Sequence, residues 1–579
     1  MRKVIVFLVL VLSAVSATAE DAAATLRRLF DEEWEWQMRD NPELATTFGD
    51  RRWDDRLTDR SAAAWTRRRE HARQLIGRIE AVDRAKLADA DKLNYDLFLY
   101  QARLADEGSR FPYELPNLDQ MSGIYMILGE LAQAIPRDTV KDYENFIARL
   151  RAYPRAVDDT IALLRRGMAS GVTPPRVIVR PVAESIASQL FDDPAKSPIY
   201  ELAFARSAVP EQERLRKEMQ DALRNDVLPA LEKLQKFWNE EYFPKTRESI
   251  AWTSVPQGKE WYAYRVRVET TTDLTADQIH ELGLFEVKRI REEMEKVKEL
   301  TGFKGTLPEF FTFLRSDPRF YYDSRESLLS AYRDIAKRID PELTRVFGRL
   351  PRLPYGVVPI PAYSEKTNTT AYYTPGAPEA HRPGYYFVNL YDLKSRPKWE
   401  MEALSLHESV PGHHLQIALA QELPDAPKFR RYGSYNAYVE GWGLYAESLG
   451  PELGMYTDPY SKFGQLTYEM WRAVRLVVDT GMHAKGWTRQ QAIDFFVANS
   501  SKPLHDIEVE IDRYLAWPGQ ALGYKLGELK IKQLRVRAER QLGRKFDVRA
   551  FHDEILGAGP LPLAMLETRM NAWIAERSR

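Results

Sequence analysis

Cysteine is absent from the 579-residue chain. Disulfide bonds, thiolate ligands and a cysteine-linked lipid anchor are therefore excluded, and a bound metal would have to be held by His, Asp or Glu. An excess of charge of either sign is absent as well, because the formal net charge is −1. The sequence gives no reason to expect a nucleic acid or an acidic membrane surface as a partner.

The N-terminal apolar stretch is too short to favour a membrane span. Residues 1–19 carry Arg2 and Lys3, then the apolar run Val4–Leu12, then a small-residue cleavage site at 17–19. This order predicts a secretory signal peptide rather than a membrane anchor, which takes ~20 apolar residues. We expect export to a bacterial periplasm, or secretion to the medium, with no stable membrane association after cleavage.

Amphipathic helices dominate the first half of the mature chain. Residues 20–250 show apolar side chains at three-four spacing with charges opposite, for example over Asp142–Arg166 and Gln212–Glu240. We expect an N-terminal helical lobe over 20–250 and a catalytic lobe over 251–579.

The hydrophobic pattern of the sequence changes near residue 250. Trp252–Val268 alternates aromatic or β-branched residues with polar ones, which predicts a half-exposed strand. Thr275 and Gln278 form a capping box that opens the next helix. A Pro, Gly and Tyr-rich region comes next, in which Tyr385–Tyr391 is predicted to be a strand.

A His-Glu pair, a Pro-Gly pair and a His-His pair lie together in Met401–Gln416, MEALSLHESVPGHHLQ. His407 and Glu408 match the opening of the zinc-peptidase signature His-Glu-x-x-His, in which a helix supplies two metal ligands and a general base. In that signature the second histidine stands four residues after the first. Pro411 occupies that position instead.

The second metal ligand is therefore displaced to His413 or His414. On an unbroken helix His413 would point roughly 120° away from His407, and His414 would lie about 10 Å along the axis. Neither could close a site with metal–nitrogen bonds of about 2 Å. Pro411 and Gly412 predict a bulge in the helix, and a bulge that absorbs two residues would bring His413 to the ligand position. We expect His413 to be the ligand and His414 to face the substrate or a ligand.

The third ligand should be a carboxylate from a neighbouring helix, because a hydrolytic zinc takes three protein ligands and a water. Glu440, in NAYVEGWGLYAES, is the leading candidate. Glu447 lies one heptad later near the same helix face, so it would orient a ligand or replace Glu440. Glu408 is then the expected general base, which takes a proton from the activated water and passes it to the leaving amine.

A tetrahedral intermediate also needs donors for its oxyanion. Tyr514 and Tyr524, in EIDRYLAWPGQALGYKLGEL, are the leading candidates. Asp479 and His483 are four residues apart on a predicted helix, so they form either a catalytic carboxylate–imidazole pair or a structural ion pair, and Asp479 is also an alternative ligand.

Three further side chains are candidates for contact with substrate. Asn389 lies in the predicted strand before the signature helix. Arg513 and Lys525 could hold a substrate carboxylate, which would favour a carboxypeptidase.

Four motifs in one order, HESVPGHHLQ, YVEGWGLYAE, RLVVDTGMHAKGW and DRYLAWPGQALGYKLGEL, resemble the mostly bacterial family designated domain of unknown function 885. That family looks like a distant relative of the gluzincin metallopeptidases, in which two His and a downstream Glu bind zinc. It is also similar to helical peptidases of the oligopeptidase, carboxypeptidase Taq and angiotensin-converting-enzyme type. The resemblance implies a mainly α-helical, two-lobed protein with a deep central cleft and a small β-sheet beside the metal.

Together these features predict an exported zinc metallopeptidase that hydrolyses short peptides. A metal-dependent amidase acting on a non-peptide or cell-wall-derived amide is one alternative, and a non-catalytic periplasmic peptide-binding protein is another. The sequence leaves open the choice between endopeptidase and exopeptidase, the oligomeric state, and the native metal among zinc, manganese, cobalt and nickel.

Overall fold

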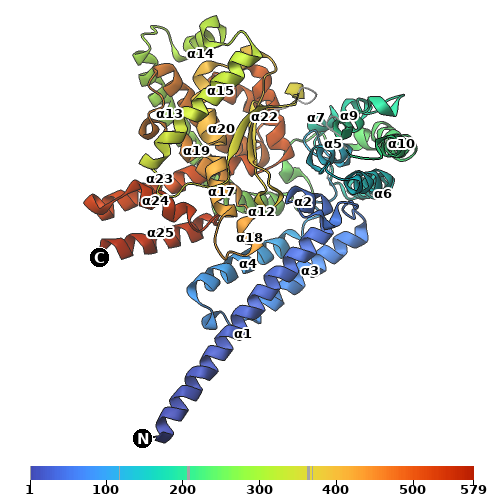
Figure 1. Cartoon of the computed structure of the whole chain (residues 1–579). Helices are drawn as coiled ribbons and strands as arrows, with labels where there is room; N and C mark the ends of the chain where they lie inside the picture. The colour runs from blue at the N-terminus through green and yellow to red at the C-terminus, as the bar shows by residue number, and fades with distance from the viewer. Residues whose placement is uncertain (1, 117, 205–208, 362–364, 368) are drawn as a thin grey trace. The chain divides into compact units, whose positions relative to one another are not determined.

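The chain folds into two compact units in a computed structural model that describes residues 2–116, 118–204, 209–361, 365–367 and 369–579. The first unit comprises residues 1–247 and 425–430, and the second comprises residues 248–424 and 431–579. Both are mainly helical, and a small sheet lies in the second, as predicted (Figure 1).

The first unit is built from helices of very different lengths. They are α1 (Arg2–Asp40), α2 (Pro42–Thr47), α3 (Ala62–Glu80), α4 (Asp89–Gly108), α5 (Ile124–Ala134), α6 (Val140–Ser170), α7 (Arg176–Val179), α8 (Val182–Ala187), α9 (Pro198–Phe204), α10 (Gln212–Ala222) and α11 (Leu228–Phe237). Helix α6 shows why they form: Thr139 and Asp142 make a reciprocal capping box at its start, and Gly171 ends it in the left-handed region with φ 73°. Its buried stripe confirms the helix predicted over Asp142–Arg166.

The second unit holds the remaining helices. They are α12 (Gly258–Thr270), α13 (Ala276–Leu300), α14 (Leu307–Ser316), α15 (Arg325–Ile339), α16 (Met401–Glu408), α17 (His413–Gln421), α19 (Asn436–Ser448), α20 (Pro459–Ala484), α21 (Arg489–Asn499), α22 (Leu504–Ala516), α23 (Gly523–Leu542), α24 (Val548–Leu556) and α25 (Leu563–Ser578). The short helix α18 (Lys428–Arg431) lies where the chain returns from the first unit to the second.

Helix α20 is the centre of the second unit. It is buried almost without interruption from Phe463 to His483, and α13, α16, α19 and α23 all pack against it. The approach of α13 is close because Gly283 has no side chain: a Cβ there would lie 2.8 Å from Leu476 and Val477. Figure 1 shows α20 among the labelled helices of this unit.

A three-stranded sheet of order β1-β3-β2 lies beside α15, α16 and α17. Strand β3 (Gly384–Val388) pairs in parallel with β1 (Tyr355–Pro359) and antiparallel with β2 (Ala371–Thr374). The predicted strand over Tyr385–Tyr391 is thus confirmed in its first half, as β3.

The strand predicted over Trp252–Val268 is wrong, because most of that segment is helix α12. Its buried side chains include Trp261, Tyr262, Val266 and Glu269, which share one face of a helix rather than one face of a strand. Alternation over ten residues does not distinguish a strand from a helix with a broad aromatic face, and packing decided between them.

The capping box of Thr275 and Gln278 is confirmed at the start of α13. Among the described residues, no helix combines the length and the apolar character needed to cross a membrane.

Candidate metal centre

The histidine motif forms two helices rather than one bulged helix. α16 ends at Glu408, α17 begins at His413, and residues 409–412 between them are not helical. The predicted bulge is thus a complete break, caused by the missing N–H of Pro411 and the ψ of −127° at Gly412. Only glycine fits here, since a Cβ at Gly412 would lie 1.9 Å from the carbonyl oxygen of His407.

The break brings His413 back beside His407. Their ring centroids lie 4.6 Å apart at an interplanar angle of 86°. Trp442 holds the break in place, because its indole N–H donates to the carbonyl of Pro411 over 2.8 Å.

Both histidines face the carboxylate of Glu440 from α19. Glu440 Oε2 lies 3.5 Å from His407 Nε2 and 3.4 Å from His413 Nε2. One ligand atom from each of the three residues lies within 4.8 Å of the others. Ligand atoms bound to a tetrahedral zinc at about 2.0–2.1 Å stand roughly 3.3–3.4 Å apart, so the two distances between histidine and glutamate fit such an ion. We call these three residues the metal-centre triad.

The electrostatics of the triad favour a positive charge at its middle. Burial opposes the ionisation of Glu440, but the imidazoles of His413 and His407 outweigh it and hold the pKa of that carboxyl well below its usual range. Burial likewise opposes protonation of His407, yet the carboxylates of Glu440 and Glu447 raise its pKa to about 9. A divalent ion would satisfy the same field in place of the proton.

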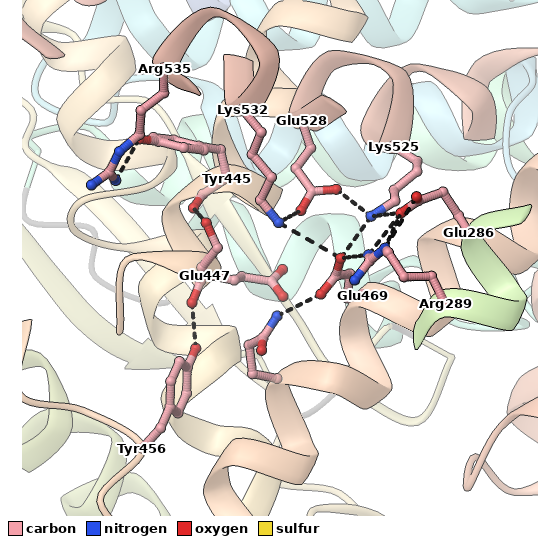
Figure 2. Close-up of polar contacts among 12 residues, drawn as sticks. Glu286, Arg289, Tyr445, Glu447, Tyr456, Glu469, Lys525, Glu528, Lys532 and Arg535 are labelled. Atoms are coloured by element: carbon pink, nitrogen blue, oxygen red, sulfur yellow. Dashed lines mark hydrogen bonds and ion pairs between the residues drawn. The ribbon is translucent and has the colours of Figure 1, made fainter. Parts of the chain in front are cut away.

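The second nitrogen of His407 is fixed from behind. His407 Nδ1 donates to Glu447 Oε1 over 2.8 Å, and Glu447 is fully buried. Arg472 Nη2 lies 3.5 Å from the same oxygen. The Tyr456 hydroxyl donates to the backbone carbonyl of Glu447 (Figure 2). Metal-binding histidines commonly carry such a carboxylate on the nitrogen away from the ion. Of the two roles predicted for Glu447, the structure therefore agrees with orienting a ligand and not with replacing Glu440.

Glycines let α19 approach the triad closely. A Cβ at Gly443 would lie 2.7 Å from the His407 ring, and one at Gly441 would lie 2.4 Å from the Cα of Gly527 on α23. Larger residues at these positions would push α19, and Glu440 with it, away from the histidines.

The carboxylate of Glu408 is unpaired among the described residues. It is half-buried at the end of α16, next to His407. Within the described part of the chain it makes no hydrogen bond or ion pair. An accessible, unpaired carboxylate beside a metal centre can accept a proton.

His414 turns away from the triad toward the sheet. Burial lowers its pKa to about 4, so the ring is neutral near pH 7. Its Nε2 donates to the Leu353 carbonyl over 3.0 Å, and the Tyr373 hydroxyl donates to Nδ1 over 2.9 Å. Both ring nitrogens are therefore occupied, and the expectation that His414 faces substrate or a ligand is wrong.

The two candidate tyrosines differ in what their hydroxyls are free to do. Tyr524 stacks near His407, with ring centroids 6.4 Å apart, and its oxygen accepts from Arg513 Nη2 over 3.2 Å. Within the described residues, its own proton has no acceptor. Tyr514 is 1% exposed, and its oxygen accepts from Arg475 Nε and Trp471 Nε1.

Tyr514 also hydrogen-bonds to Glu510, so its proton is engaged. Its expected role as an oxyanion donor is therefore wrong, and Tyr524 remains in a position to donate.

Asp479 and His483 do not form the predicted pair. Asp479 accepts from the Tyr262 hydroxyl over 2.6 Å and from the Gly519 N–H, and burial raises its pKa to about 7. His483 is fully buried, and its two nitrogens bond to the Trp252 N–H and to a backbone carbonyl. Neither residue is part of the triad, so the catalytic role given to His483 and the ligand role given to Asp479 are wrong.

Two of the three predicted substrate contacts are internal. Asn389 is 1% exposed, and its amide donates to the carbonyls of Glu365 and Thr369. Lys525 is fully buried on α23, where its ammonium contacts three glutamates (Figure 2). Neither side chain can reach a substrate. Arg513 is different, since its side chain is 14% exposed and contacts Tyr524.

Sequence reasoning missed Arg472 and Glu510. Arg472 lies one helical turn before Arg475 on α20 and contacts Glu447. Glu510 lies three residues before Arg513 and pairs with it. The three-residue spacing of opposite charges was the available signal for Glu510. No local pattern marks Arg472, because its partner is on another helix.

Comparison with known proteins places these residues in a family. A family model described as "Bacterial protein of unknown function (DUF885)" matches residues 42–570. The crystal structure of a "putative lipoprotein" from Colwellia psychrerythraea is 30% identical, with a TM-score of 0.90, over 96% of this chain and 99% of that chain. A "putative lipoprotein of unknown function" from Shewanella oneidensis shares the fold, with 17% identity and a TM-score of 0.67 over 95% and 99% of the two chains. No curated protein matches the sequence.

Proposed function

We propose that this chain, which belongs to the DUF885 family of bacterial proteins, is an exported metal-dependent peptidase that hydrolyses short peptides. One arrangement supports this most directly: a triad of two imidazoles and a carboxylate, with Glu408, whose carboxylate is unpaired among the described residues, next to His407 in the chain. A pure binding protein has no need of such a base.

His407, His413 and Glu440 would hold the ion, and zinc is the ion we propose because two nitrogens and one carboxylate oxygen suit it. Manganese, cobalt and nickel also accept this set, and availability decides among them. When bound, the ion supplies Lewis-acid activation of a water and of the scissile carbonyl.

The chain's own side chains then move the proton and stabilise the charge. Glu408 takes a proton from the attacking water and returns it to the leaving amine. Tyr524 donates its free phenolic proton to the oxygen on which negative charge develops. Glu447 keeps the ring of His407 in the orientation that presents Nε2 to the centre.

Short peptides are the proposed substrates because the centre is recessed. His407 is 2% exposed and His413 is 9% exposed, so only an extended chain could bring a carbonyl to them. The order of charged, apolar and small residues at the N-terminus supports export, and so does the description of both similar structures as lipoproteins.

Replacing Glu408 tests the proposal. Glu408→Gln should lower turnover of a peptide library by roughly 10²–10⁴-fold while the bound metal, measured on the same sample, stays at the wild-type level. Glu402→Gln on the same helix is the matched control, since Glu402 contacts Arg338 and the Tyr456 N–H and should keep activity. Full activity in Glu408→Gln with normal metal content would remove Glu408 from the reaction. Absence of metal and of cleavage in the wild type would reject the peptidase.

A further inference from the structure

Two arginines share one carboxylate beside the metal-centre triad. Arg475 Nη2 lies 3.0 Å from Glu510 Oε2, and Arg513 Nη1 donates to Glu510 Oε1 over 3.4 Å. All three side chains are buried or nearly so. A guanidinium without a counter-charge is costly to bury, so the second positive charge calls for an anion that the protein does not supply.

Among the described residues, two other arginines near the triad each have a carboxylate partner. Arg472 lies 3.5 Å from Glu447, and Arg265 pairs with Glu269, the further carboxylate near the triad. A divalent ion in the triad would be balanced by the ligand carboxylate and the general base. The surplus of one positive charge is therefore located on the two arginines that share Glu510.

Arg513 is the more accessible member of this pair, with a side chain that is 14% exposed against 3% for Arg475. Its Nη2 donates to Gln520 Oε1 over 2.9 Å and to Tyr524 Oη over 3.2 Å. Gln520 in turn donates to Asn436 Oδ1 over 3.3 Å, and Asn436 lies one helical turn before Glu440 on α19. The guanidinium is thus tied both to the helix that carries a ligand and to the tyrosine beside His407.

We propose that Arg513, positioned by Gln520 and Tyr524, binds the terminal carboxylate of a peptide substrate, and that the chain cleaves peptides from their C-terminal end. The inference rests on the peptidase function proposed above. Guanidinium groups are the preferred partners of carboxylates because their planar N–H donors match them. An N-terminal amine would need a surplus of negative charge, and the nearby Glu269 is already paired with Arg265.

Matched substrates test this on the metal-loaded full-length protein. An N-acetylated peptide ending in a free carboxylate should be cleaved with a kcat/KM about 10- to 100-fold above that of the same peptide ending in an amide, the range expected for hydrogen bonds to charged groups. A third peptide, amidated but with Glu as its last residue, separates the terminal carboxylate from a side-chain carboxylate. A fourth, without the acetyl group, detects any need for a free N-terminus.

Variants then assign the preference to Arg513. Arg513→Gln should bring the acid-to-amide ratio to within about threefold, and Arg513→Lys, which keeps the charge but loses the fork, should retain part of it. Arg540→Gln, on the exposed surface of α23, is the control and should keep the wild-type ratio. If Arg513→Gln does not fold, the ratio measured on the wild type still decides.

Binding to Glu408→Gln separates failure of this inference from failure of the proposed function. If calorimetry shows tighter binding of the free acid while no peptide is cleaved by the wild type, the carboxylate site stands and the peptidase fails. Equal cleavage and equal binding of acid and amide would overturn the inference and leave the peptidase intact. Cleavage that requires a free N-terminus, or that depends on the side-chain carboxylate, would overturn it as well.

Discussion

Two buried groups of charged residues in the second unit differ in how their side chains are paired. One is the metal-centre triad. The other, which we call the buried ion network, consists of Glu286, Arg289, Glu469, Lys525, Glu528 and Lys532 from α13, α20 and α23 (Figure 2). In the network, Lys525 Nζ lies 2.6 Å from Glu528, 2.9 Å from Glu469 and 3.0 Å from Glu286.

The two groups differ in whether their charged side chains are all paired within the protein. The network has three cations for three carboxylates, and those glutamates raise the pKa of Lys525 above its ordinary value although burial opposes the charge. Such a group is complete without a ligand and holds helices together. In the triad, one ligand atom from each residue lies within 4.8 Å of the others, and Glu408, next to His407 in the chain, has no hydrogen-bond or ion-pair partner within the described residues. Incomplete bonding, rather than charge or burial, distinguishes the candidate functional site from the network.

Replacing His413, which belongs to the triad, and its neighbour His414, which does not, should give the largest difference in bound metal. His413→Ala should lose nearly all bound metal and all activity, because a missing ligand removes several kcal/mol of metal-binding free energy. His414→Ala should keep its metal and lose only stability, since its two nitrogens bond to Tyr373 and Leu353. Metal analysis of the folded fraction of both variants measures this. Metal lost from His414→Ala but kept by His413→Ala would reverse the assignment.

The local parts of both groups could be predicted from sequence. The triad residues are found together as predicted, because the motif supplied the two histidines and Glu440, near the start of a helix further along the chain, was the leading candidate for the third ligand. That they bind a metal stays a prediction. The interruption of the helix between His407 and His413 also came from local chemistry, since proline and glycine interrupt a helix wherever they stand together.

The distinction between the two groups could not be predicted, because burial and pairing depend on residues far apart in the chain. Lys525 and Arg513 look alike in sequence, as basic residues in one tyrosine-rich stretch. Only packing shows that Lys525 meets Glu286 and Glu469 from two other helices, and that the hydroxyl of Tyr514 is bonded to Glu510. The error over Trp252–Val268 has the same origin, since local alternation was outweighed by tertiary packing.

Breaking the network should cost stability and leave the triad unchanged. Lys525→Met would leave three buried glutamates with two cations, Arg289 and Lys532, and we expect a loss of about 3–5 kcal/mol in the free energy of unfolding, measured in urea. The metal content of the folded protein should not change. Lys530→Met is the control on the same helix, because its partner Glu567 is half-exposed and such pairs contribute about 1 kcal/mol or less. Unchanged stability with weaker peptide binding would show instead that Lys525 contacts substrate.

Replacing Glu447 shows whether a buried carboxylate outside the triad affects metal binding. Glu447 is as buried as the residues of the network, yet it is bonded to His407 of the triad. Glu447→Gln keeps the shape of the side chain but removes the charge that orients His407, so metal affinity should fall by about 10- to 100-fold. Competition with a chelator measures that affinity, and a urea titration of the metal-free protein measures stability separately. Glu452→Gln, whose partner Arg535 lies away from the triad, should change neither. If Glu447→Gln lowered stability and left metal affinity intact, Glu447 would have a structural role only, and metal binding would depend on the three triad residues alone.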